Sequence, residues 1–233
     1  FEKGKKVSPL FKDFKKKVDA LDLPDDEKRA LEKKAEKALL EYVGPAYRDL
    51  MAFSKKLDER TKSSLGVWAL PKGDEYYRFR LEQMTTTKMR PEKIHEIGLR
   101  EVDRIHREIR KIMDKVGFEG SLQDFFDYMK SDRFTYPDTQ AGKQAYLKKT
   151  RKIIGRMQNK LPDYFATLPK AKLKVKPVEA YREKSAGIAF YNGPSLEGDR
   201  PGIYYVNLYK MADNPKYKME ALAYHEAVPG HHM

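Results

Sequence analysis

The spacing of apolar residues changes once along this 233-residue chain, and that change restricts the folds it can adopt. Through roughly the first three fifths, apolar side chains recur every three or four positions, which is the period of an amphipathic helix. The longest case runs from Pro91 to Val116 and ends at Gly117. The same pattern predicts further helices over residues 9–23, 24–42, 47–57, 121–129 and 140–161, with an interruption at Gly44-Pro45.

The final third follows a different pattern, because its apolar residues alternate or form short runs. Lys172 to Val178 has the pattern of an edge strand, with a proline near its end. Gly187–Tyr191 and Gly202–Leu208 are two further predicted strands. Asn214-Pro215 then opens a last helix, which runs into His225. The predicted fold is therefore mainly α-helical with a small β-sheet before the last helix, an α+β architecture.

These patterns divide the chain into a helical region over residues 1–165 and a second region over 166–233. The second region holds the small sheet and the start of the last helix. Within the helical region, residues 63–80 contain Ser63, Ser64, Gly66, Pro71 and Gly73 and are predicted to form a loop. The aromatic residues of this loop either line a cleft or, more commonly, anchor the loop to a core: Trp68, Tyr76 and Tyr77.

Cysteine is absent, which excludes a disulfide scaffold, an iron–sulfur cluster and a cysteine nucleophile. A zinc site would therefore have to use histidine, aspartate or glutamate. No apolar run approaches the roughly 20 residues that a transmembrane helix needs.

The net charge of +13 raises the question of a nucleic-acid or anionic-surface partner. Most lysines, however, alternate with acidic residues in the helical stretches; Lys15-Lys16-Lys17, for example, is followed by Asp19 and Asp22. This is the pattern of a solvated helical surface. A nucleic-acid-binding signature, a glycine-rich basic loop and a basic tail are all missing, so a nucleic-acid partner is not favoured.

Three of the five histidines fall in the last nine residues, where His225-Glu226 is followed by His231-His232. In the zinc-peptidase pattern His-Glu-x-x-His, two histidines four positions apart share one helix face and one metal, and the glutamate acts on the metal-bound water. The remaining two, His95 and His106, lie in a predicted amphipathic helix and are expected to be ordinary surface or packing residues.

The spacing departs from that pattern, because His225 and His231 are six positions apart. On a regular helix this separation is a rotation of about 600° and a rise of about 9 Å, so the two rings could not share an ion. Pro229-Gly230 suggests a solution, since proline removes a backbone donor and glycine permits unusual dihedral angles. We therefore predict a bulge that absorbs two residues and brings His231 beside His225.

Three interpretations of this cluster remain open: a catalytic metal site, a structural metal clip, and the start of a purification tag. A catalytic site is favoured because Glu226 stands where a general base is needed.

The string from His225 to His232 resembles the signature of the bacterial domain-of-unknown-function family 885, which looks like a branch of the gluzincin-type zinc metallopeptidases. Supporting similarities begin at about residue 60 and include Leu70-Pro71-x-Gly73, Thr85-Thr86-Thr87, the stretch from Pro91 to Ile105, and Arg200 to Leu208. The resemblance implies a zincin-like metallopeptidase fragment that cuts peptide bonds. It also makes export or a lipid anchor plausible.

The resemblance implies that His225 and His231 bind zinc, that Glu226 is the general base, and that His232 either supports a ligand or replaces one. The third ligand, a glutamate, and the oxyanion-stabilising groups are expected beyond Met233. The chain by itself is therefore expected to be inactive. Competing interpretations are a basic helical binding module and a family member that has lost activity.

A peptide substrate in such a fold would add a strand to a sheet edge. Gly187–Gly193 is the predicted edge, and Asn192 and Gly193 are the first-choice substrate contacts. Tyr204 and Asn207 are the second choice, and plain hairpin roles for all four remain an alternative.

Overall fold

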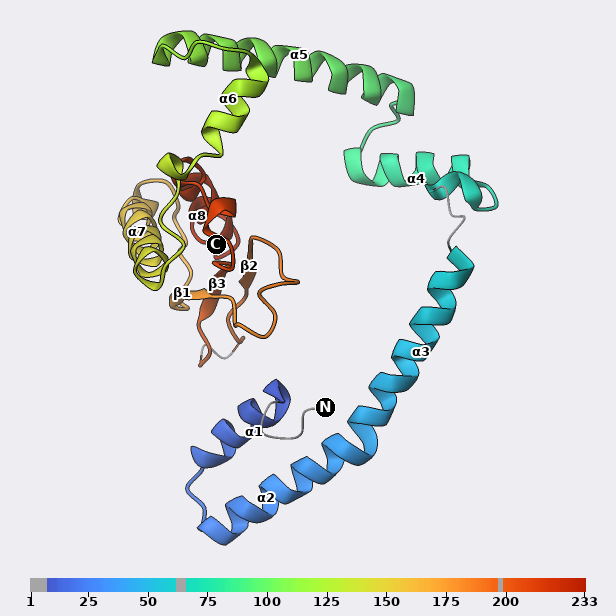
Figure 1. The fold of residues 1–233 in the computed structure, drawn as a ribbon, viewed down its shortest axis with the longest axis vertical. Coiled ribbons are helices and arrows are strands. Elements are labelled where there is room, and N and C mark those ends of the chain that lie inside the picture. Colours follow the sequence, from blue (N-terminus) through green and yellow to red (C-terminus); the bar gives the residue numbers. More distant parts are fainter. Residues whose placement is uncertain (1–7, 62–65, 197–198) are drawn as a thin grey trace. The chain divides into compact units, whose positions relative to one another are not determined.

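The computed structural model describes residues 8–61, 66–196 and 199–233. The chain forms two compact units, residues 1–100 and 101–233, and the boundary falls inside the long helix α5. Figure 1 labels the α-helices in chain order as α1 (Pro9–Asp19), α2 (Asp25–Ala38), α3 (Gly44–Thr61), α4 (Gly73–Thr85), α5 (Pro91–Val116), α6 (Leu122–Met129), α7 (Gln140–Gln158) and α8 (Met219–Glu226). The strands are β1 (Leu173–Pro177), β2 (Ala189–Asn192) and β3 (Gly202–Val206).

The mainly helical α+β fold predicted from the sequence is confirmed. Helix α5 has the bounds that the apolar stripe predicted, because proline is well suited to the first helical turn and Gly117 adopts a positive φ of 66° at its end. None of the helices that the structure describes is both long enough and apolar enough to cross a membrane.

Two predictions within the first unit were wrong. Gly44-Pro45 does not break the helix, since one turn of π-helix (Leu39–Val43) joins α2 to α3 and the Gly44 N–H bonds to the Leu39 carbonyl. A wider turn accommodates Pro45, which has no N–H to donate and whose ring would clash in a regular turn.

The second error concerns residues 63–80, where a loop was predicted. Residues 62–65 lie outside the described residues, but Gly66–Ala69 form a 3₁₀ turn and α4 begins at Gly73. Gly73 signals close packing here, because a Cβ on it would lie 2.1 Å from the Val67 carbonyl oxygen.

Helix α6 begins with the capping box that its sequence predicted. The Asp124 N–H donates to the Ser121 hydroxyl at 3.1 Å, and the Ser121 N–H donates to the Asp124 carboxylate at 2.8 Å. These bonds satisfy two donors that the helix itself leaves unpaired.

We expect Ser121→Ala to lower the free energy of unfolding by about 1 kcal/mol, because the side-chain acceptor of the cap is lost. Denaturant unfolding measures this change. Ser185→Ala, which alters an exposed serine outside the helices, is the control; equal stability of the Ser121 variant and wild type would show that the cap contributes nothing.

The sheet has the order β1-β3-β2, with β1 parallel and β2 antiparallel to the central strand β3. Both β1 and β2 are therefore edge strands, as predicted. All five residues of β3 are buried, because both faces of the sheet are covered.

On one face, Tyr204 and Val206 pack against α7 and α8 in the main core, together with Ile154 and Ala223. On the other face, Ile203 and Tyr205 pack with the segment after β1 and with Phe190. Helix α7 belongs to the predicted helical region, yet it shares this core with β1. A separate domain over 166–233 stays a prediction.

Candidate metal centre

The chain leaves helical geometry directly after α8, as predicted. The Ala227 N–H still bonds to the carbonyl four residues back, but the Gly230 N–H donates to the Tyr224 carbonyl at 2.9 Å and the His231 N–H to the His225 carbonyl at 3.0 Å. Both of the latter bonds reach back six residues. Two residues are therefore looped out, and His231 takes the backbone position that the fourth residue after His225 holds in a regular helix.

This bulge brings the two histidine rings together. The ring centroids of His225 and His231 lie 4.8 Å apart, with an angle of 79° between the ring planes. Both residues are exposed, so a ligand can reach the rings from solvent. Sequence analysis therefore identified both the pairing and the segment that permits it.

Gly230 is the residue that allows this close return of the chain. A Cβ at position 230 would lie 1.9 Å from the His225 carbonyl oxygen and 2.5 Å from the Tyr224 carbonyl oxygen. Both neighbours are backbone atoms of α8 and cannot rotate away. Any larger residue must shift the segment that holds His231.

Glu226 is buried at the end of α8, with 7% of its surface exposed. Among the described residues, none donates a hydrogen bond to its carboxylate. The carboxylate of Glu226, which follows His225 in the chain, therefore has no donor competing for its oxygens in the described part of the chain.

Tyr204 lies close to this carboxylate. Its side chain is fully buried, and its hydroxyl has no hydrogen-bond partner in the described part of the chain. Burial raises the pKa of the Tyr204 hydroxyl, and Tyr146 and the Glu226 carboxylate raise it further. The hydroxyl therefore stays protonated beside Glu226 and is a donor without an acceptor.

The four predicted substrate contacts differ in their surroundings. Asn192 and Gly193 are exposed at the end of the edge strand β2, where a substrate could reach them. Tyr204 is enclosed in the core, and the Asn207 amide donates to the carbonyls of Glu183 and Ala186. The surroundings of the second pair indicate structural roles, and substrate contact by any of the four stays a prediction.

His232 is buried, in contrast to the exposed His225 and His231. Its Nδ1 lies 2.8 Å from the Tyr191 hydroxyl, and its Nε2 lies 3.0 Å from the Ala171 carbonyl oxygen. Both ring nitrogens of His232 thus have hydrogen-bond partners, and a role of His232 in supporting or replacing a ligand stays a prediction. Sequence analysis missed Tyr191, because the strand pattern does not show what its outer face meets.

The geometry of His225 and His231 fits part of a zinc site. Two imidazoles on one tetrahedral zinc ion, with Zn–N bonds of about 2.0–2.1 Å, have ring centroids about 5 Å apart, close to the separation of His225 and His231. Among the described residues, no group of three or more histidine, aspartate and glutamate side chains is placed to hold one ion. The described chain thus offers two imidazole ligands and a neighbouring carboxylate.

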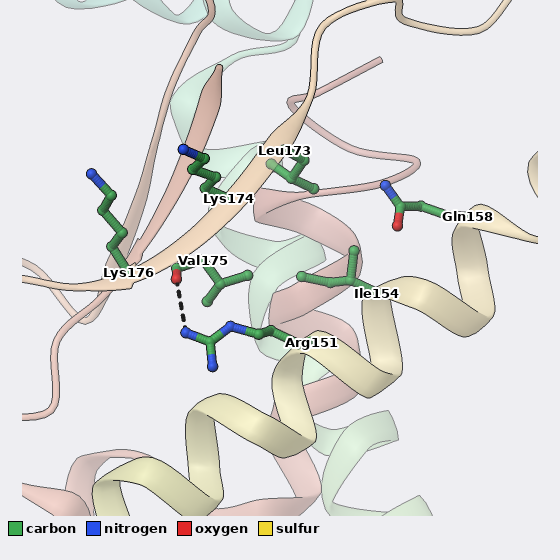
Figure 2. A pocket seen from close by; sticks show the side chains of 7 residues that line it. All are labelled: Arg151, Ile154, Gln158, Leu173, Lys174, Val175 and Lys176. Atoms are coloured by element: carbon green, nitrogen blue, oxygen red, sulfur yellow. Dashed lines mark hydrogen bonds between the residues drawn. The ribbon is translucent and has the colours of Figure 1, made fainter. Parts of the chain in front are cut away.

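The described residues also form hollows that are lined by other side chains. The first, about 380 Å³, lies between α7 and β1 and is lined by Arg151, Lys174 and Lys176 around the apolar side chains of Ile154 and Val175. Figure 2 shows the Arg151 guanidinium donating to the Val175 carbonyl, at 3.2 Å.

The second hollow, about 610 Å³, lies in the first unit and is lined by Trp68, Tyr77 and His95. Two of the three aromatics that sequence analysis singled out thus line a cleft. The rings of Trp68 and Tyr77 also meet edge to face, with centroids 5.9 Å apart.

The sequence of the chain matches a known protein family. The family model "Bacterial protein of unknown function (DUF885)" matches residues 2–233. The chain belongs to this family. The predicted family membership is confirmed, and because the description of DUF885 names no activity, its link to metallopeptidases stays a prediction.

A solved structure is also similar to this DUF885 chain. The "putative lipoprotein from Colwellia psychrerythraea" is 32% identical, with a TM-score of 0.90. The match covers 98% of this chain and 40% of the Colwellia protein, so the chain spans less than half the length of that relative. No curated protein matches.

Proposed function

We propose that this chain carries part of a zinc-dependent peptidase site, in which His225 and His231 bind the metal and Glu226 is the general base. The observation that supports this most strongly is the two-residue bulge, which pairs the histidine rings beside a buried carboxylate. The sequence resemblance implies a third ligand, a glutamate, in addition to the two histidines.

When bound, zinc would acidify a water molecule and polarise the scissile carbonyl. Glu226 would take a proton from the attacking water as the water oxygen forms a bond to the carbonyl carbon. The same carboxyl then gives the proton to the nitrogen of the breaking C–N bond, which leaves as an amine.

The edge strand β2 is the proposed substrate surface. β3 occupies one side of β2. No strand of the described residues pairs with the other side, which could bind an extended peptide through main-chain hydrogen bonds. Tyr191 of β2 stacks on His231, with centroids 6.1 Å apart and an angle of 10° between the rings. A peptide along β2 would therefore pass the proposed metal ligands.

Metal analysis of the native protein, purified without a polyhistidine tag, tests the first part of this proposal. We expect about one zinc ion per chain in wild type, and almost none in His231→Ala, because one imidazole cannot hold the ion in the absence of its partner. Elemental analysis after dialysis gives both values.

His95→Ala is the matched control, since His95 is an exposed histidine of α5 in the other unit. It should retain the wild-type zinc content. Absence of zinc from the wild-type protein would refute the proposal, and so would equal losses in the two variants.

A second candidate function is binding of an anionic macromolecule at the basic hollow beside β1 (Figure 2). Three cationic side chains line it and no acidic residue does. Elsewhere, many lysines are paired with acids on their own helices, for example Lys17 with Asp13 and Lys111 with Glu108. Binding of RNA or DNA that weakens steeply with salt would favour this function.

A further inference from the structure

Tyr191 joins β2 to both terminal histidines. Its hydroxyl bonds to His232 Nδ1 at 2.8 Å, and its ring lies parallel to that of His231. The ring also meets that of His232 edge to face, with centroids 5.8 Å apart. No other residue of the edge strand has such contacts with the histidine segment among the described residues.

The hydrogen bonds determine the tautomer of neutral His232. The Ala171 carbonyl can only accept, so Nε2 of His232 carries the proton and donates to it. Nδ1 is then the acceptor, and the Tyr191 hydroxyl donates to it. His232 is thereby held between the strand β2 and the segment that precedes β1.

Gly202 of β3 provides independent support for this arrangement. A Cβ on Gly202 would lie 2.3 Å from the Tyr191 hydroxyl oxygen and 2.6 Å from His232 Nδ1. Only glycine leaves room for the pair at this point of the central strand. The Tyr191–His232 contact thus lies directly against the central strand and depends on the absence of a side chain at Gly202.

We propose that Tyr191 is a positioning residue for the second metal ligand, His231. The ring sets the plane of the His231 imidazole, and the hydroxyl fixes the neighbouring His232, so the segment after the bulge has one orientation. Tyr191 also lies on the proposed substrate strand. The position of a bound peptide would therefore be coupled to the position of the metal ligand. This inference rests on the proposed zinc site.

Tyr191→Phe tests the hydroxyl and Tyr191→Leu tests the ring. We expect the dissociation constant for zinc, measured at fixed pH by competition with a chromophoric chelator, to rise about tenfold in Tyr191→Phe and further in Tyr191→Leu. In the metal-free protein, the ¹⁵N signal of His232 Nδ1 should shift in Tyr191→Phe, because its hydrogen-bond donor is gone.

Phe190→Leu is the matched control, because Phe190 is the neighbouring aromatic of β2 and stacks on Tyr205 on the opposite face of the sheet. It should lower stability but leave zinc affinity unchanged. A purely structural role for Tyr191 would predict that zinc affinity follows stability in all three variants.

Two other results would overturn the inference, and they are distinguishable. If wild type binds zinc and Tyr191→Phe binds it equally well with unchanged histidine signals, Tyr191 does not position the ligand and the zinc site stands. If wild type binds no zinc, the proposed function fails and this inference fails with it.

Discussion

Glu226→Gln should lower the rate of peptide hydrolysis by about 10²–10⁴-fold while leaving the zinc content unchanged. Glutamine has nearly the same size and shape as glutamate, so the packing at the end of α8 should survive. Its amide oxygen is too weak a base to take a proton from water. Since Glu226 is proposed as a base and not as a ligand, zinc should still bind.

The measurement is zinc-dependent cleavage of a library of fluorogenic peptides by the native protein, together with its metal content. Glu220→Gln is the control, because Glu220 is an exposed glutamate of the same helix whose carboxylate pairs with Arg156 and accepts from the Tyr224 hydroxyl. It should keep wild-type activity. Full activity in Glu226→Gln would exclude Glu226 as the base, whereas loss of zinc would make it a ligand.

Gly230→Ala should have the largest effect on the geometry of the site. The new Cβ would overlap the His225 and Tyr224 carbonyl oxygens, so the segment must move or the end of α8 must unwind. We expect the free energy of unfolding to fall by about 3 kcal/mol. Zinc affinity should fall by about tenfold or more, because His231 moves with the segment.

Denaturant unfolding and zinc competition measure the two effects. Gly155→Ala in the last turn of α7 makes the same chemical change where a Cβ would meet nothing within 4 Å. We expect the free energy of unfolding of Gly155→Ala to rise by about 0.5–1 kcal/mol, since alanine stabilises a helix relative to glycine. If Gly230→Ala behaves like Gly155→Ala, the bulge does not depend on the absence of a side chain at position 230.

The predictions from the sequence agreed with the structure where the interactions join residues that are close together in the chain. The stripe that predicted α5 and the Ser121–Asp124 cap arise from residues three or four positions apart, so the sequence shows them directly. The errors at Gly44-Pro45 and Gly73 share one cause. Glycine and proline signal a departure from a simple helix, but only packing decides whether that departure is a loop, a π-turn or a close contact.

The sequence by itself determined most of the helices and the edge strands. It also determined the need for a bulge, because the six-residue spacing of His225 and His231 fits no regular helix. Tertiary structure alone decided that Glu226 is buried beside Tyr204 and that His232 is held by Tyr191 and Ala171, which lie 41 and 61 positions away in the chain. Such contacts depend on how α8 packs on the sheet. The spacing of apolar residues along the chain does not reveal that packing.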